Sequence, residues 1–186
     1  MRIISGALKG RSINFLKNSN TRPLKDNVRE SIFNILNHSR YIKVKVKNSN
    51  VLDLYSGTGS FGIECISRDA KKVTFIEKDL NASNLLKNNL NKLSISSSAK
   101  IYNSEIENVI IDFKKEHYHI FFFDPPFVDQ NFLSIIGLIK KNKIFKKNHI
   151  VIIHREKKSN DKLESFLNVF ETKYYGRSKI IFGEFS

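Results

Sequence analysis

The chain has 186 residues, a length that suits one domain with a hydrophobic core of its own. Its hydrophobic content of 40% is ordinary for a globular protein, and its formal net charge of +14 favours a polyanionic partner. We find no apolar run long enough to span a membrane and expect no signal peptide. The single cysteine, Cys65, excludes an internal disulfide framework and a cysteine-cluster metal site. Composition therefore favours a cytoplasmic protein.

The first predicted elements lie in a basic segment, residues 1–49. Residues 2–16 alternate loosely between apolar and polar side chains around a turn at residues 9–11, which predicts a β-hairpin. Asp26 is expected to cap a helix, and residues 37–49 are expected to form a basic linker. The apolar stripe of this helix consists of Val28, Ile32, Ile35 and Leu36.

Positive charge is concentrated in the same segment. Residues 1–47 contain 11 Lys and Arg but only two acids, Asp26 and Glu30, whereas the rest of the chain contains 21 basic and 16 acidic residues. Five of the eight arginines lie in this segment, and a general enrichment in lysine does not explain that distribution. We therefore predict that the segment binds nucleic acid. The residues expected to do so are Arg2, Lys9, Arg11, Arg22 and Arg29.

From about residue 50 onwards, strand patterns alternate with helix patterns. Strands are expected at residues 51–54, 73–76, 99–102, 119–123 and 149–153, and helices after Gly62 and near residues 79–93, 131–140 and 161–168. Ser104 and Glu107 form an S-x-x-E pattern that predicts a capping box. Residues 171–175 and 179–185 are expected to form a terminal hairpin. Repeated strand–helix units predict an α/β fold with a mainly parallel sheet and right-handed crossovers.

A glycine-rich turn follows the strand at residues 51–54. Gly57, Gly59 and Gly62 have the G-x-G-x-x-G spacing, which allows a tight turn, close approach of a ligand, and packing of helix on strand. The next strand ends at Glu77, where a carboxylate can accept the hydroxyls of a ribose. The spacing predicts a ribose-bearing cofactor without deciding which one.

The sequence Asp124-Pro125-Pro126-Phe127 directly follows the apolar run at residues 120–123. The prolines stiffen the turn and remove two N–H donors, which leaves the Pro125 carbonyl and the Asp124 carboxylate as neighbouring acceptors. Phe127 adds a flat apolar face. These four residues are predicted to clamp a planar group that carries an amino donor, such as a nucleobase.

Two carboxylates favour S-adenosylmethionine over NAD as the cofactor. Asp53 precedes the glycine turn, where its charge would face the cationic methionine end of that cofactor. Asp124 ends a strand at the same predicted crevice, because ligands of such sheets bind beyond the carboxyl ends of the strands. A hydride-transfer enzyme has no evident use for D-P-P-F, whereas a methyl-transfer enzyme acting on an amine does.

With these motifs the chain resembles the class I methyltransferases that modify amino nitrogens and carry [DN]-P-P-[FYW]. Within them it is similar to the RsmD family, the 16S ribosomal RNA (guanine-N2)-methyltransferases. The resemblance covers nearly the whole chain and is most specific near the amino end. It is carried there by residues 1–6 and 9–11, by Thr21-Arg22-Pro23, and by Asp26, residues 28–30 and residues 32–36. Leu24, Asn27 and the turn Tyr-Ser-Gly-Thr-Gly depart from the commoner family pattern.

The resemblance implies a Rossmann-like class I methyltransferase, with a seven-stranded sheet that has helices on both faces and an antiparallel last strand. Residues 1–49 would form an RNA-binding extension, and residues 50–186 the catalytic core. The implied catalytic residues are Asp124, Pro125, Pro126 and Phe127. The implied cofactor-binding residues are Asp53, Tyr55, Ser56, Gly57, Gly59, Glu77, Lys78, Asn103 and Ser104. The expected partner is 16S rRNA in the small ribosomal subunit, and the protein is expected to act as a monomer without a metal ion.

Three other interpretations stay open. An adenine-N6 DNA methyltransferase would share the clamp, although the chain shows no additional target-recognition domain. A non-catalytic RNA-binding or assembly protein could keep the same fold, and G-x-G-x-x-G alone also fits an NAD-dependent oxidoreductase. A metal pair at His117 and His119 is disfavoured, because no third ligand has suitable spacing.

Overall fold

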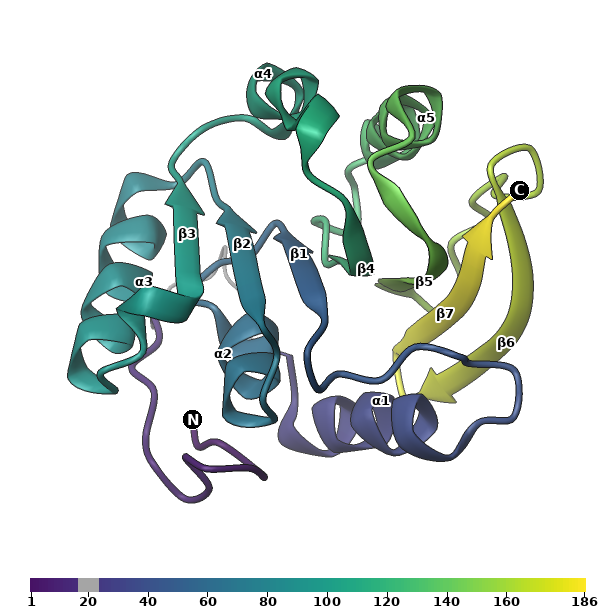
Figure 1. Ribbon diagram of the computed structural model, residues 1–186. Helices are drawn as coiled ribbons and strands as arrows, with labels where there is room; N and C mark the ends of the chain where they lie inside the picture. Colours follow the sequence, from purple (N-terminus) through teal and green to yellow (C-terminus); the bar gives the residue numbers. More distant parts are fainter. Residues whose placement is uncertain (17–23) are drawn as a thin grey trace.

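The computed structural model describes residues 1–16 and 24–186 (Figure 1). Seven strands form one sheet: β1 (Asn50–Leu54), β2 (Lys72–Ile76), β3 (Ala99–Tyr102), β4 (Tyr118–Phe123), β5 (Phe145–Glu156), β6 (Leu167–Tyr175) and β7 (Ser178–Phe185). The α-helices are α1 (Asp26–His38), α2 (Ser60–Ser67), α3 (Leu80–Lys92), α4 (Ile106–Ile110) and α5 (Phe132–Asn142). Two short 3₁₀ helices, η1 (Ser96–Ser98) and η2 (Ile111–Lys115), precede β3 and β4. None of the helices within the described ranges is long and apolar enough to cross a membrane.

The strand order is β3-β2-β1-β4-β5-β7-β6. Neighbouring strands from β3 to β5 are parallel, and β7 pairs antiparallel with both β5 and β6. The prediction of a mainly parallel sheet that ends in an antiparallel hairpin is therefore confirmed. The order reverses between β1 and β4, and in open α/β sheets this reversal opens a crevice at the carboxyl ends of the strands.

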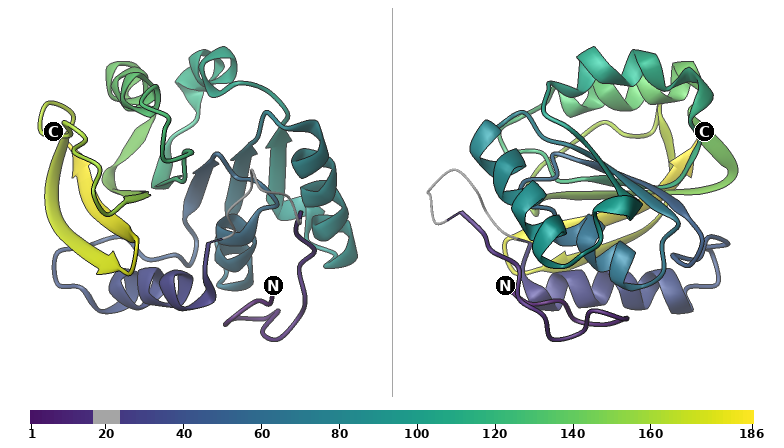
Figure 2. Two further views of the ribbon diagram at one scale, coloured as in Figure 1. Left: turned by 180° about the vertical axis from the view of Figure 1, so that it is seen from behind. Right: turned by 60° about the vertical axis from the view of Figure 1, so that its left-hand side comes forward.

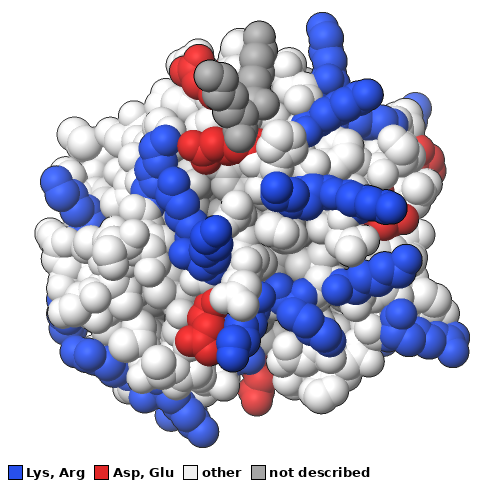
Figure 3. All heavy atoms as spheres, in the orientation of Figure 1, with Lys and Arg blue, Asp and Glu red and all other residues white. Residues whose placement is uncertain are grey.

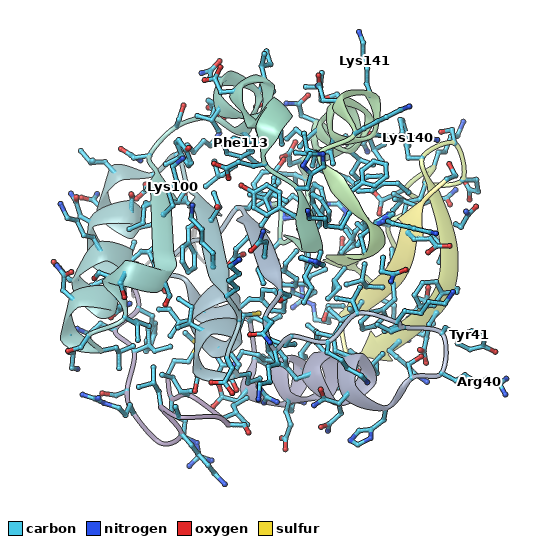
Figure 4. All side chains as sticks on the ribbon, in the orientation of Figure 1. Arg40, Tyr41, Lys100, Phe113, Lys140 and Lys141 are labelled. Atoms are coloured by element: carbon cyan, nitrogen blue, oxygen red, sulfur yellow. The ribbon has the colours of Figure 1, made fainter. Side chains whose placement is uncertain are left out.

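Helices cover both faces of the sheet (Figures 1 and 2). On the face covered by α1 and α2, the rings of Phe33 and Phe61 stack with centroids 5.3 Å apart, and Phe61 stacks on Phe122 at 4.1 Å. On the face covered by α4 and α5, Phe113 of η2 (labelled in Figure 4) lies 5.3 Å from the ring of Tyr102. Apolar residues thus fill both sides of the central strands.

The segment before β1 packs into the same core as the sheet. Ile3 and Ile13 are 1% and 2% exposed, and a single antiparallel bridge joins Arg2 to Ser12. The expected hairpin at residues 2–16 is therefore reduced to a short loop with one bridge. The expected basic linker instead alternates exposed lysines with three buried residues, Ile42, Val44 and Val46.

Three local predictions are wrong. No helix forms at residues 161–168. Asp161 forms an ion pair with Arg155 at the start of this range, and β6 already begins at Leu167. Lys25 rather than Asp26 is the N-cap of α1, and the Asp26 carboxylate pairs with an arginine one turn further on. The expected capping box is absent, because α4 begins after Glu105 and no side chain caps it. The prediction of strand 99–102 is confirmed residue for residue.

Candidate active site

The glycine turn joins β1 to α2 and is tied to the end of β2. The Gly57 N–H donates to Glu77 Oε2 at 2.7 Å, and the Asp79 N–H donates to Glu77 Oε1 at 2.8 Å. Gly57 and Gly59 have φ values of +54° and +86°, a region that glycine adopts without steric cost. A Cβ on Gly57 would meet nothing within 4 Å, so the turn presents its backbone to open space.

Gly62 lies in α2 and allows that helix to pack closely on the sheet. A Cβ there would meet Phe75 Cε1 at 2.2 Å. The Gly62 N–H donates to Asp53 Oδ2 at 2.9 Å, and Asp53 is only 1% exposed. The Asp53 carboxylate is therefore turned into the protein, so it can act on a ligand through its charge rather than through a broad contact.

Three carboxylates approach one another at the carboxyl ends of β1, β2 and β4. Burial raises the pKa of Asp53 well above its usual value; the Gly62 N–H opposes this shift, while the charges of Asp124 and Glu77 add to it. A positively charged ligand placed among these groups would stabilise their ionised forms. The site is therefore electrostatically suited to a cation.

The other predicted cofactor residues surround this turn. Tyr55 has a φ of +59°, and its pKa is raised by burial and by nearby Asp129. Ser56 is buried, and its hydroxyl donates to the Ile76 carbonyl. The Asn103 side-chain amide donates to the carbonyls of Glu77 (2.9 Å) and Lys78 (3.1 Å), which fixes the loop after β2.

Two further members of that set lie at the surface of the same region. The Lys78 ammonium pairs with Glu105 at 3.3 Å, and both side chains are exposed. Ser104 is partly exposed in the loop between β3 and α4. The structure thus brings the predicted cofactor residues to one edge of the sheet.

The D-P-P-F turn leaves β4 next to β1, and His154 of β5 contacts two of its residues. His154 Nδ1 lies 2.8 Å from Asp124 Oδ1, and the side chains are 7% and 22% exposed. The His154 ring also meets the Phe127 ring edge to face, with centroids 5.6 Å apart and an interplanar angle of 76°. One imidazole therefore fixes both the carboxylate and the aromatic face of the predicted clamp.

Arg155, the next residue of β5, holds the backbone of the same turn. Its Nη1 donates to the Pro126 carbonyl at 3.1 Å. Its Nε and Nη2 bond to the two Asp161 oxygens at 3.1 and 3.0 Å. Burial alone would raise the pKa of Asp161, but the hydrogen bonds from Arg155 and Ser159, together with the charges of Arg155 and Lys179, lower it overall.

Sequence reasoning placed His154 at the end of a strand near the crevice with a structural role only, and assigned no role to Arg155. The available signal was two ionisable residues in succession at the end of an apolar strand. Their partners in the D-P-P-F turn, Asp124 and Pro126, lie 30 and 29 residues away in the sequence, so no local pattern identifies these contacts.

The predicted RNA-binding residues are placed less uniformly. Arg2, Lys9 and Arg11 are exposed near the C-terminal end of α2, where Leu8 N–H donates to Ser67 Oγ at 3.0 Å. Arg22 lies outside the described residues.

The prediction for Arg29 is wrong. Its side chain is 0% exposed, lies 3.0 Å from Asp26 and 3.8 Å from Glu64, and donates to the Arg2 carbonyl. Burial lowers the pKa of Arg29, and the two carboxylates oppose that shift. Arg29 therefore anchors the amino-terminal segment and does not reach the surface.

The family described as "Conserved hypothetical protein 95" matches residues 1–184. The chain belongs to this family. Ribosomal RNA small subunit methyltransferase D of Haemophilus influenzae is 36% identical over 84% of this chain and 79% of its own length. The protein of the same name from Buchnera aphidicola (Acyrthosiphon pisum) is 40% identical over 84% of this chain and 78% of its own length. The resemblance to the RsmD family is therefore confirmed.

Solved structures that match this chain over nearly their whole length have the same fold. A putative methyltransferase from Escherichia coli superposes with a TM-score of 0.82 at 26% identity, covering 100% of this chain and 97% of its own. A putative methylase from Haemophilus influenzae gives a TM-score of 0.75 at 30% identity, covering 98% and 96%. The fold is the Rossmann-like fold of class I methyltransferases, as predicted.

Proposed function

We propose that this protein transfers a methyl group from S-adenosylmethionine to the exocyclic N2 of a guanine in 16S ribosomal RNA. Membership of the family supports an activity in which S-adenosylmethionine is the methyl donor and ribosomal RNA is the acceptor. The guanine target, and the small subunit or its assembly intermediate as substrate, are the finer parts of the proposal. One observation carries it: Asp124 and Phe127, held together by His154, stand beside the glycine turn at the reversal of strand order.

The residues around the glycine turn fit S-adenosylmethionine. Each Glu77 oxygen accepts one backbone N–H and keeps a lone pair that can accept a ribose hydroxyl. Gly57 leaves its ligand side open, and Asp53, Glu77 and Asp124 together favour a positively charged group. When bound, this cofactor supplies an electrophilic methyl group on a cationic sulfur.

Asp124 and Phe127 would prepare the amine for attack. The lone pair of an exocyclic amine is delocalised into the ring, so the nitrogen is a poor nucleophile. The free oxygen of Asp124 and the Pro125 carbonyl would accept its two hydrogens, which turns the lone pair outwards and stabilises positive charge as it develops. Phe127 would stack on the base, a contact worth about 1–3 kcal/mol. The chemistry requires no metal ion and no protein nucleophile.

His154 would keep Asp124 in that role. A proton on Nδ1 allows His154 to donate to Asp124 Oδ1, which leaves Oδ2 to accept from the substrate. The target base would leave its RNA loop to reach the site, and bases in loops are extruded at little cost because few pairs are lost. We further propose that the protein acts as a monomer in the cytoplasm.

A methyl-transfer assay tests the proposal. Labelled S-adenosylmethionine would be offered with undermethylated small ribosomal subunits, free 16S RNA or duplex DNA, and the modified nucleosides identified by mass spectrometry. We expect N2-methylguanosine from a ribosomal substrate. Asp124→Ala should abolish turnover while calorimetry shows nearly unchanged cofactor binding. Label in DNA adenine, or near-normal turnover by Asp124→Ala, would contradict the proposal.

A further inference from the structure

We propose that the RNA loop presenting the target base docks on a rim formed by Lys157, Lys158, Tyr174 and Arg177. This inference deepens the proposed function and rests on it for the identity of the RNA. The rim joins two segments of the chain, the loop that follows β5 and the end of the β6–β7 hairpin.

The first segment lies directly beside the D-P-P-F turn. Arg155 donates to the Pro126 carbonyl, and the loop after β5 folds back so that Asp161 pairs with the same guanidinium at 3.0 Å. Lys157 and Lys158 lie within this closed loop. Lys157 follows His154 by three residues, which is about 10 Å of extended chain at a rise of about 3.3 Å per residue.

The second segment is held against the first by a backbone bond. The Lys157 N–H donates to the Arg177 carbonyl at 2.9 Å, next to the paired ends of β5 and β7. Tyr174, on β6, is 61% exposed, and the Lys157 ammonium lies 6.0 Å from the centre of its ring. An exposed aromatic ring thus lies near one cation, Lys157, and a backbone bond holds Arg177 beside the same loop.

The chemistry of the rim fits unpaired RNA. Lys157, Lys158 and Arg177 are exposed, and none of them forms an ion pair with another residue in the described ranges 1–16 and 24–186. Phosphates bind such cations, and an exposed ring accepts a stacked base of any sequence. Figure 3 shows basic side chains spread over one face of the molecule, with fewer acidic side chains between them.

The cations near the amino end are farther from the chemistry. Ala7 and Leu8 bond to Ser67 at the C-terminal end of α2, whereas the glycine turn precedes its N-terminal end. The eight residues of α2 separate these two points by about 12 Å. We therefore assign the contact with the loop nearest the target base to the rim, and not to Arg2, Lys9 or Arg11.

Charge reversal at the two ends of β5 tests the rim. Lys157→Glu/Lys158→Glu changes two exposed lysines at the carboxyl end, and Lys146→Glu/Lys147→Glu makes the same change at the amino end, 10 to 12 residues away. Binding of a labelled stem-loop RNA would be measured by fluorescence anisotropy at several salt concentrations. We expect the first variant to bind at least tenfold more weakly, with a log–log salt slope smaller by about 1.4, and the second to change neither value by more than about twofold.

A second pair of variants tests the ring. Tyr174→Ala should weaken RNA binding by about fivefold or more, and Tyr174→Phe should retain it, because stacking needs only the ring. Thermal unfolding of every variant would be recorded to show that each is folded.

Several outcomes distinguish failure of the rim proposal from failure of the proposed function. Equal effects of the two lysine pairs, or loss only on reversal of Arg2, Lys9 and Arg11, would overturn the rim. Rim-dependent RNA binding by a wild-type protein that methylates no RNA would uphold the rim and refute the proposed function. Normal methylation and binding by both Lys157→Glu/Lys158→Glu and Tyr174→Ala would refute the rim alone.

Discussion

At the scale of single residues, the contact between His154 and Asp124 is the one on which the proposed chemistry most depends. The two side chains come from neighbouring parallel strands and meet at 2.8 Å in a partly buried setting. A hydrogen bond to a charged group contributes about 1.5–3 kcal/mol, and its loss would let the carboxylate rotate away from the substrate. His154 therefore acts as a positioning residue.

Substitutions that keep or remove the donor distinguish positioning from packing. His154→Asn retains an N–H donor near the place of Nδ1, whereas His154→Leu retains volume without a donor. We expect His154→Leu to lower kcat by about tenfold or more, with an unchanged cofactor Kd, and His154→Asn to recover most of the loss. Equal kcat values for the two variants in steady-state assays would show that His154 only fills space.

At the scale of elements, α2 connects the ligand turn to the amino-terminal segment. The glycines of the turn and of α2 serve two distinct purposes: Gly57, in the turn, faces open space, and Gly62, in α2, faces the ring of Phe75. A side chain added at Gly57 would therefore affect cofactor binding, whereas one added at Gly62 would affect the stability of the fold.

We expect Gly62→Ala to destabilise the protein by about 1–3 kcal/mol, because its Cβ would overlap Phe75 Cε1 at 2.2 Å. Gly57→Ala should cost about 1 kcal/mol of backbone strain at its φ of +54°. It should also weaken cofactor binding more than Gly62→Ala does. Urea unfolding and calorimetric titration of both variants would check this. A Gly62→Ala protein with wild-type stability would show that the ring of Phe75 moves aside freely.

At the scale of the whole molecule, Glu64 joins the amino-terminal segment to α2. Its carboxylate is 0% exposed and accepts the N–H groups of Ile4 (2.8 Å) and Ser5 (2.9 Å). Arg68 pairs with it at 2.9 Å, and Arg29 approaches to 3.8 Å. One buried carboxylate therefore holds three separate parts of the chain.

Glu64→Gln should destabilise the whole molecule by about 3–5 kcal/mol, because it leaves buried Arg29 short of negative charge. The exposed Glu30→Gln is the matched control and should change stability by less than about 0.5 kcal/mol. Hydrogen exchange would follow the amides of Ile3 and Val51 in the same samples. Faster exchange confined to the amino-terminal segment, with the sheet unaffected, would show that the two parts unfold independently.

The sequence by itself determined the alternation of strands and helices, the glycine turn and the turn at residues 124–127. Each of these is written in consecutive residues, since the alternation of strands and helices follows from hydrophobic period and the turns follow from glycine and proline. The tertiary structure decided where the polar and charged side chains lie and which partners they have. Arg29 is buried against Glu64, His154 meets Asp124, and the Arg155–Asp161 pair replaces an expected helix with a loop. The physical reason is that a buried polar or charged side chain needs a hydrogen-bond partner or an opposite charge. Most of those partners come from segments far away in the sequence.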